Sequence, residues 1–181
     1  MLINLEGPDG SGKTTLSDAI TAELIREDLP VIQTKDGECK VDTHPKSRYR
    51  NKPTDLISAI TDMAYSNNIF VLDRGPISDV VYRNFDDYES VITESQVYDL
   101  LSLLKTHIII VYCRTDIAEQ KMLERGDDNL IAIVKHKEIT KKYDYMLSSI
   151  INRCQVLRFD YSKETAENFA KRLVEIIKIG E

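Results

Sequence analysis

Short apolar runs alternate with longer amphipathic stretches along the chain. Five of these runs are almost continuously apolar, which is typical of strands covered on both faces. We expect these strands at residues 1–6, 30–34, 69–73, 107–113 and 155–159. Between the strands, apolar residues recur with the 3.6-residue period of a helix. Helices are expected over 11–28, 54–66, 77–83, 94–104, 115–124, 130–151 and 163–179.

This alternation of strands and helices predicts a parallel sheet between two layers of helices, a three-layer α/β sandwich. The length of 181 residues fits a single domain. Ligands of such sheets bind at the carboxyl ends of the strands, so the residues directly after each strand are the first candidates for function. The segment 35–53 is polar, basic and poor in apolar residues, and we expect a long functional loop there.

The first predicted strand runs into a glycine-rich stretch, EGPDGSGKTT, at residues 6–15. This stretch satisfies the phosphate-loop pattern GxxxxGK[ST], in which backbone amides surround phosphate oxygens, the lysine contacts the β- and γ-phosphates and the hydroxyl binds Mg²⁺. The pattern lies between a predicted strand and a predicted helix, as the motif requires. It implies a purine triphosphate with Mg²⁺, and we expect ATP. The predicted ATP-binding residues are Gly7, Asp9, Gly10, Ser11, Gly12, Lys13, Thr14, Thr15 and Arg114.

A second polar cluster, DRGPISDVVY, follows the third predicted strand. Asp73 is placed to hold Mg²⁺ together with Thr14, or to orient the acceptor. Arg74 comes next, and a guanidinium fork at the end of a buried strand suits a second phosphate group. Motors, switches, synthetases and kinases share the phosphate loop, so the function has to be inferred from clusters such as this one.

These motifs resemble those of the thymidylate kinase family of nucleoside monophosphate kinases and, more distantly, the deoxynucleoside kinases. Residues 6–15 match the first family motif throughout, and TKDG at 34–37 stands where the family has a Thr-Arg-Glu-Pro type turn. The third family motif has a serine five residues after the aspartate of an Asp-Arg pair and an aromatic residue four positions after that serine. The sequence has both. LERGDD at 123–128 takes the place of the basic lid. The compact length also resembles phage-encoded members.

The resemblance implies a three-layer P-loop NTPase sandwich with a short lid at about 123–130, and it implies a role for each matching residue. Asp9 would bond the sugar hydroxyl of the acceptor nucleotide, Arg74 would bind its phosphate, and Arg125 would reach over the transferring phosphoryl group. Lys13, Asp9, Arg74, Asp73 and Arg125 are therefore the expected catalytic residues, and Thr14 and Asp73 the metal ligands. The expected acceptor-binding residues are Asp9, Lys35, Asp36, Arg48, Arg50, Arg74, Ser78 and Tyr82.

The sequence departs from the family in two places. The lid has Asp127 and Asp128 where relatives carry basic residues, which leaves Arg125 open as a lid residue or a surface arginine. Residues 54–66 contain no arginine to read a thymine edge, which leaves the base of the acceptor open. Arg48, Arg50 and Lys52, just before that helix, are the alternatives. The acceptor is expected to be a pyrimidine deoxynucleotide, either dTMP or a 5-modified dUMP.

Composition narrows the function further. The formal net charge is −6 and the pI is about 5.2, which argues against a binder of polymeric nucleic acid. No apolar run approaches the ~18 residues of a membrane span. The three cysteines, Cys39, Cys113 and Cys154, form no CxxC pair and fit reduced thiols of a cytoplasmic protein. The expected partners are small-molecule nucleotides, and the resemblance leaves a homodimer open.

Three other functions stay open at this stage. A deoxynucleoside kinase would need a carboxylate base near the 5′-hydroxyl, and Asp36 could serve. Asp9 favours a monophosphate acceptor instead, because nucleoside kinases of this kind usually carry an uncharged residue there. A nucleotide switch would be expected to carry an NKxD run, and this sequence has none. A polynucleotide kinase is disfavoured by the acidic net charge of the chain.

Overall fold

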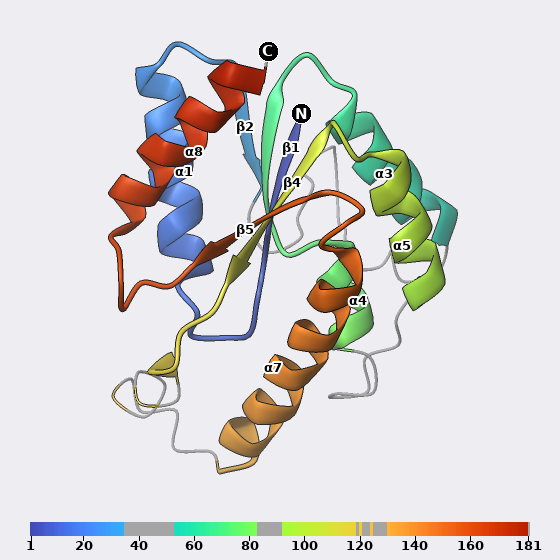
Figure 1. Cartoon of the computed structure of the whole chain (residues 1–181), viewed down its shortest axis with the longest axis vertical. Coiled ribbons are helices and arrows are strands. Elements are labelled where there is room, and N and C mark those ends of the chain that lie inside the picture. The colour runs from blue at the N-terminus through green and yellow to red at the C-terminus, as the bar shows by residue number, and fades with distance from the viewer. Residues whose placement is uncertain (35–52, 83–91, 119, 121–123, 125–129, 181) are drawn as a thin grey trace.

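The structure, a computed structural model, describes residues 1–34, 53–82, 92–118, 120, 124 and 130–180 (Figure 1). Five parallel strands form one sheet in the order β2-β3-β1-β4-β5. The strands are β1 (Leu2–Glu6), β2 (Val31–Thr34), β3 (Ile69–Asp73), β4 (Ile108–Cys113) and β5 (Gln155–Phe159). The first strand of the chain is therefore the central one, and its carboxyl end lies between those of β3 and β4.

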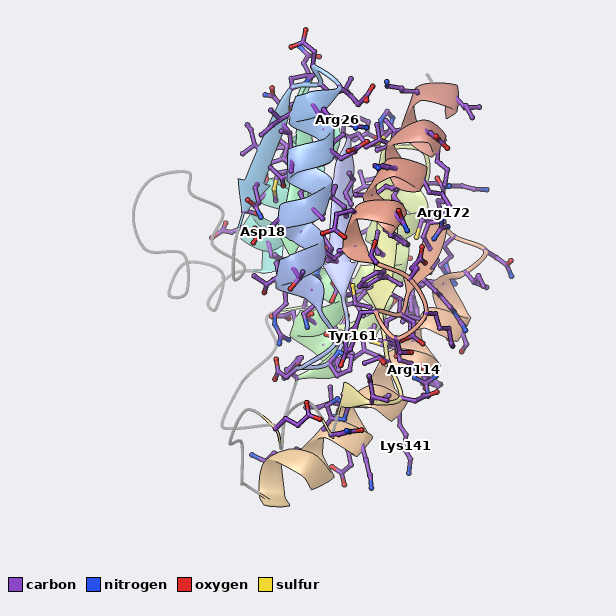
Figure 2. All side chains as sticks on the ribbon, turned by 90° about the vertical axis from the view of Figure 1, so that its left-hand side faces the viewer. Asp18, Arg26, Arg114, Lys141, Tyr161 and Arg172 are labelled. Carbon is purple, nitrogen blue, oxygen red and sulfur yellow. The ribbon has the colours of Figure 1, made fainter. Side chains whose placement is uncertain are left out.

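Helices cover both faces of this sheet. On one face α1 (Lys13–Arg26) and α8 (Ala166–Gly180) lie side by side, as Figure 2 shows. In the described part of the chain, the helices on the other face are α3 (Pro53–Ala64), α4 (Pro76–Val81), α5 (Glu94–Leu103) and α7 (Leu130–Ile150). The predicted three-layer sandwich is confirmed.

Alternate residues of each strand build two separate cores, because successive side chains of a strand point to opposite faces. Ile3, Leu5 and Val111 are fully buried beneath α1 and α8. Leu2 and Ile110 are fully buried on the other face, against α3, α5 and α7. This is why the central strands read as unbroken apolar runs rather than as alternating ones.

The edge strands are less buried than the central ones. β1 and β4 are buried at every position, whereas β2 and β5 have exposed and half-buried residues. The predicted strands coincide with the observed ones to within two residues. The largest shift is at the last helix, which was expected from Lys163 and begins at Ala166.

Two predicted features fall largely outside the described residues: the long loop expected at 35–53, of which only Pro53 is described, as the first residue of a helix, and most of the lid at 123–130. Of the predicted helix 115–124, residues 119 and 121–123 also lie outside them. In the part of the chain that is described, no helix is both long and apolar enough to span a bilayer.

Candidate functional site

The glycine-rich loop joins the carboxyl end of β1 to the start of α1. Gly10 and Gly12 have φ values of 73° and 84°, in the left-handed region that favours glycine. Gly12 is the N-cap of α1 and offers no side-chain cap to the amides of the first turn. These amides, together with the positive end of the helix dipole, suit an anion such as a phosphate group.

The Lys13 side chain folds back over this loop, so that its ammonium group lies among the oxygen atoms of the loop. Its Nζ donates to the carbonyl oxygens of Gly7 at 2.9 Å and Pro8 at 2.7 Å, and to Ser11 Oγ at 3.4 Å. Burial lowers the pKa of Lys13, and the positive charge of Arg74 lowers it further. The ammonium group is therefore held at the loop by fixed oxygen acceptors, ready to act as a point charge beside a bound phosphate.

Two oxygen-bearing side chains meet where α1 begins and β3 ends. Thr14 Oγ1 donates to Asp73 Oδ2 at 3.2 Å, across 59 residues of sequence. A hydroxyl and a carboxylate are oxygen donors of the kind that Mg²⁺ prefers. The pair therefore fits the magnesium site expected from the sequence, and these two residues would hold the ion.

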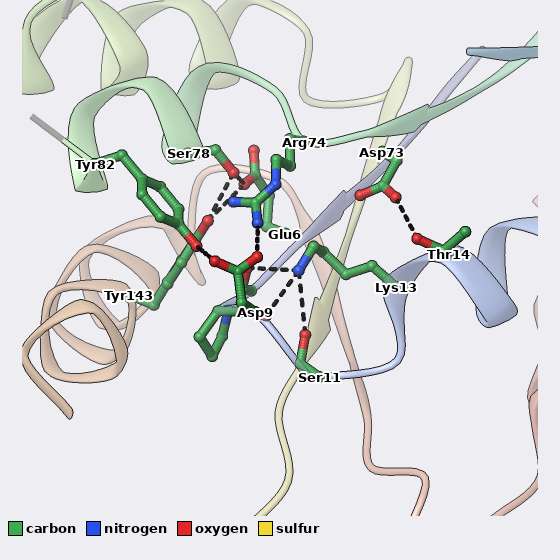
Figure 3. Close-up of polar contacts among 12 residues, drawn as sticks. Glu6, Asp9, Ser11, Lys13, Thr14, Asp73, Arg74, Ser78, Tyr82 and Tyr143 are labelled. Carbon is green, nitrogen blue, oxygen red and sulfur yellow. Dashed lines mark hydrogen bonds and ion pairs between the residues drawn. The ribbon is translucent and has the colours of Figure 1, made fainter. Parts of the chain in front are cut away.

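Beside the glycine-rich loop, Arg74 is joined to Asp9 in an ion pair (Figure 3). The guanidinium carbon also lies 4.6 Å from the centre of the Tyr82 ring, and the Tyr82 hydroxyl donates to Asp9 Oδ2 at 3.4 Å. The Asp9 side chain is 60% exposed and the Arg74 side chain 28%. Three residues predicted to bind the acceptor thus form one accessible cluster next to Lys13.

The electrostatics of this cluster keep Arg74 charged and Tyr82 neutral. Burial works against the charge of Arg74, but Tyr82 and Asp9 outweigh it and raise the pKa of the guanidinium. Burial raises the pKa of Tyr82 to about 12, even though Arg74 opposes this. At neutral pH the cluster therefore presents a fixed positive fork beside a phenol that can donate a hydrogen bond.

Beneath Arg74 lies a buried polar network that sequence reasoning did not predict. The carboxylate of Glu6 accepts hydrogen bonds from Asn4 Nδ2 at 2.7 Å and from Ser78 Oγ. Ser78 Oγ also lies 2.6 Å from the hydroxyl of Tyr143, on α7. Ser78 was predicted to bind the acceptor, and its hydroxyl is engaged here by Glu6 and Tyr143. In the sequence, Glu6 was only the first residue of the stretch EGPDGSGKTT, and no role was predicted for it.

No protein-family profile matches the sequence, and no curated protein matches it significantly. Solved structures do match. The YorR protein of Bacillus subtilis, in complex with phosphorylated GDP, has a TM-score of 0.74 at 22% identity over 99% of this chain and 96% of its own. Deoxyadenosine kinase of M. mycoides, with the products dCMP and dCDP, has a TM-score of 0.58 at 17% identity over 98% and 99% of the two chains.

Shikimate kinase of Acinetobacter baumannii, in complex with shikimate, has a TM-score of 0.56 at 13% identity over 99% of this chain and 94% of its own. The chain has the fold of the P-loop kinases. At these identities the likeness concerns the fold alone, so the substrates have to be argued from the site itself.

On the opposite side of the phosphate loop, the P-loop kinase fold brings the ends of β4 and β5 together. Arg114, which was predicted to bind ATP, follows β4, and Tyr161 follows β5 (Figure 2). Arg114 Nη1 lies 3.4 Å from Asp144 Oδ2 of α7, an ion pair. A Cβ atom on Gly12 would lie 3.0 Å from the Tyr161 ring, so Tyr161 packs directly on the loop. The sequence contained no motif that singled out Tyr161.

Other residues of the predicted site lie on α1 or outside the described part. Thr15 is exposed on the first turn of α1, next to Thr14. Tyr143, whose hydroxyl lies beside Ser78, is fully buried in the core. The predicted site residues that lie outside the described part are Lys35, Asp36, Arg48, Arg50, Lys52 and Arg125.

Proposed function

We propose that this protein transfers the γ-phosphoryl group of ATP to the 5′-phosphate of a pyrimidine deoxynucleotide, dTMP or a 5-modified dUMP, and forms the diphosphate. The observation that carries the proposal is the ion pair between Asp9 of the phosphate loop and Arg74 at the end of β3. The pair puts an acidic and a basic group beside Lys13, on one side of the loop. A nucleoside monophosphate offers a partner for each of them: a sugar hydroxyl and a phosphate.

Competition between partners favours a phosphorylated acceptor. Arg74 pairs with the carboxylate of Asp9, so an acceptor has to offer the guanidinium an equally strong partner. A phosphate dianion does so through two parallel charge-assisted hydrogen bonds. Asp9 is then released to accept from a sugar hydroxyl. A nucleoside brings no anion of its own and would leave this pair in place.

The expected chemistry is in-line displacement at phosphorus. An oxygen of the acceptor phosphate forms a bond to the γ-phosphorus, and the bond to the β,γ-bridging oxygen breaks, leaving ADP. Such a reaction needs positioning and positive charge more than covalent help from the protein. Lys13 and Arg74 supply that charge. A magnesium ion held by Thr14 and Asp73 would neutralise charge on the β- and γ-phosphates when bound.

Two further observations support a nucleotide acceptor. The motifs resemble thymidylate kinases at residues 6–15 and at the Asp73–Tyr82 spacing. Two of the solved proteins with similar folds hold nucleotides: YorR has phosphorylated GDP, and the deoxyadenosine kinase has dCMP and dCDP. A small-molecule acceptor also fits the acidic net charge of −6.

The direct test is an assay of ADP release with Mg²⁺ and ATP. The acceptors are a matched panel of deoxynucleosides and their 5′-monophosphates, including 5-substituted uracils. We expect turnover with pyrimidine monophosphates and little with the matching nucleosides. Turnover with the nucleosides alone would replace the proposal by a deoxynucleoside kinase.

Replacement of Arg74 tests the role of the guanidinium. Arg74→Ala removes charge-assisted hydrogen bonds worth about 1.5–3 kcal/mol to the acceptor phosphate, so we expect kcat/KM for the acceptor to fall roughly 10- to 150-fold. The Kd for ATP, measured by calorimetry, should stay nearly unchanged. Arg172→Ala removes an exposed arginine of α8 that pairs with Glu164; this variant is the control and should alter neither quantity. Loss of ATP binding without an effect on the acceptor would contradict the assignment.

A further inference from the structure

Glu6 is a fully buried carboxylate between the two loops that carry the site, and the proposed chemistry does not use it. It is the last residue of β1, directly before Gly7 of the phosphate loop. Its exposed fraction is 0%. A buried carboxyl group is costly unless its oxygens are satisfied by hydrogen bonds, so its partners indicate what it does.

One oxygen of Glu6 holds the start of α4. Glu6 Oε1 accepts from the backbone amides of Gly75 at 3.0 Å and Ile77 at 3.3 Å. Gly75 is the N-cap of α4 and has no side chain that could cap the helix itself. A carboxylate borrowed from β1 therefore does what an N-cap side chain does in other helices.

The other oxygen reaches two hydroxyl groups. Glu6 Oε2 accepts from Ser78 Oγ, in the first turn of α4, and from Tyr143 of α7 at 3.5 Å. Figure 3 shows these side chains converging on Glu6, directly behind Arg74. Burial raises the pKa of Glu6, although hydrogen bonds from Ser78 and Asn4 oppose this. A neutral carboxyl group, which has one acceptor oxygen and one donor, would fit the same set of partners.

What Glu6 fixes is the turn that aims Arg74. Arg74 has a φ of 67°, a left-handed conformation that is unfavourable for a residue with a side chain. Its own amide donates to the carbonyl of Leu5 at 3.0 Å, and the next residue, Gly75, is held by Glu6. A strained conformation persists only where its surroundings over-determine it. Glu6 and Leu5 do this from both sides of Arg74.

We propose that Glu6 is a positioning residue that sets the direction of Arg74 and thereby the affinity for the acceptor phosphate. The inference rests on the proposed function, in which Arg74 binds that phosphate. It requires the length of the Glu6 side chain, which has to span from β1 to α4, and does not require its charge. A general base would require the charge instead.

Two conservative variants separate these requirements. Glu6→Asp keeps the charge and loses one methylene, so it cannot reach the α4 amides. Glu6→Gln keeps the length and loses the charge. We expect Glu6→Asp to raise the acceptor KM about tenfold or more, roughly the effect of one lost hydrogen bond, with the ATP KM nearly constant. Glu6→Gln should stay within about threefold of the wild type. A larger loss for Glu6→Gln than for Glu6→Asp, especially in kcat, would overturn the proposal.

A double-mutant cycle tests whether Glu6 acts through Arg74. In an Arg74→Ala background, Glu6→Asp should add no further increase in the acceptor KM, because the group that it positions is gone. An undiminished effect in that background would refute the inference. Ser17→Ala is the control for the loss of one hydrogen bond at a buried side chain, because Ser17 Oγ accepts from Gln33 Nε2 at 3.0 Å. It should leave the acceptor KM unchanged.

A structural readout decides the inference even if no nucleotide is an acceptor. At 20.7 kDa the chain suits NMR of arginine side chains, and the Nε–Hε signal of Arg74 is identified by its loss in Arg74→Lys. We expect a sharp, dispersed signal in the wild type and Glu6→Gln, and a broadened or random-coil signal in Glu6→Asp. An unchanged signal in Glu6→Asp would disprove the positioning role. Absence of turnover with every monophosphate would instead disprove the proposed function alone.

Discussion

At the residue scale, the backbone of the phosphate loop is shaped by its contact with β4. Gly7 has a φ of 150°, and a Cβ atom there would lie 2.1 Å from the carbonyl oxygen of Cys113. The neighbouring strand therefore requires the first glycine of the motif by itself, with no ligand bound. A sequence motif alone names the glycine and does not reveal this reason.

Substitution of Gly7 should be costly even without ligand. Gly7→Ala places a methyl group against backbone atoms that cannot move aside, in a conformation unfavourable for a side chain. We expect the free energy of unfolding to fall by about 2–4 kcal/mol, measured with urea. Gly180→Ala, at a position with no atom within 4 Å of the added methyl group, is the matched control and should be neutral or slightly stabilising. Equal stability of the two variants would refute this account.

At the element scale, the start of α8 shows how local hydrogen bonds override a periodic pattern. The apolar period suggested a helix from Lys163. The carbonyl of Asp160 instead accepts from the amides of Lys163 and Glu164, which forms a separate turn. Thr165 Oγ1 then accepts from the amide of Asn168 at 3.3 Å and caps the helix proper. Side-chain caps of this kind shift helix ends without changing which helices exist.

The packing of α8 against the sheet gives a second prediction. Phe169 is 1% exposed, and its ring meets that of Phe159 edge to face at 5.3 Å. Phe169→Ala should lower the free energy of unfolding by about 3–5 kcal/mol, because it leaves a cavity between α8 and β5. Ile179→Ala on the same helix removes a side chain that is 86% exposed and should cost less than about 0.5 kcal/mol. Urea unfolding of both variants distinguishes buried packing from helix propensity.

At the scale of the whole molecule, the two cores share one sheet and should unfold together. Cys113 is buried in the core beneath α1 and α8, and Cys154 in the core on the other face. Burial raises the pKa of Cys113 to about 12 and that of Cys154 to about 11. Since the thiolate is the reactive form, both groups should be inert in the folded protein at pH 8.

The two cysteines therefore report on cooperativity. In pulsed alkylation across a urea series, with the modified peptides quantified by mass spectrometry, Cys113 and Cys154 should become reactive at the same midpoint. Earlier reaction of Cys154 would mean that the layer of α3, α5 and α7 opens independently, and would contradict a single cooperative unit.

The free energy of unfolding should also depend on pH through these two cysteines, because both thiols have raised pKa values in the folded state. Their contribution to stability should be lost as the pH rises above about 9 toward 12.

The sequence by itself determined the alternation of strands and helices, the phosphate loop and the Asp73–Arg74 cluster. These features are local: each depends on residues within one element or one turn, so periodicity and spacing reveal them. The parallel sheet also followed, because unbroken apolar strands have to be covered on both faces. Asp9 and Arg74 were assigned separately, to a sugar hydroxyl and to a phosphate.

Only the tertiary structure decided that Asp9 and Arg74 pair with each other, 65 residues apart, and that Glu6 caps α4. The bond from Tyr143 to Glu6 spans 137 residues. Contacts of this kind leave no local pattern, because they arise where strand order brings distant chain segments to the same sheet edge. The order β2-β3-β1-β4-β5 makes the first strand central. For that reason Glu6, which in the sequence is only the end of a strand, accepts hydrogen bonds from the start of α4, next to Arg74.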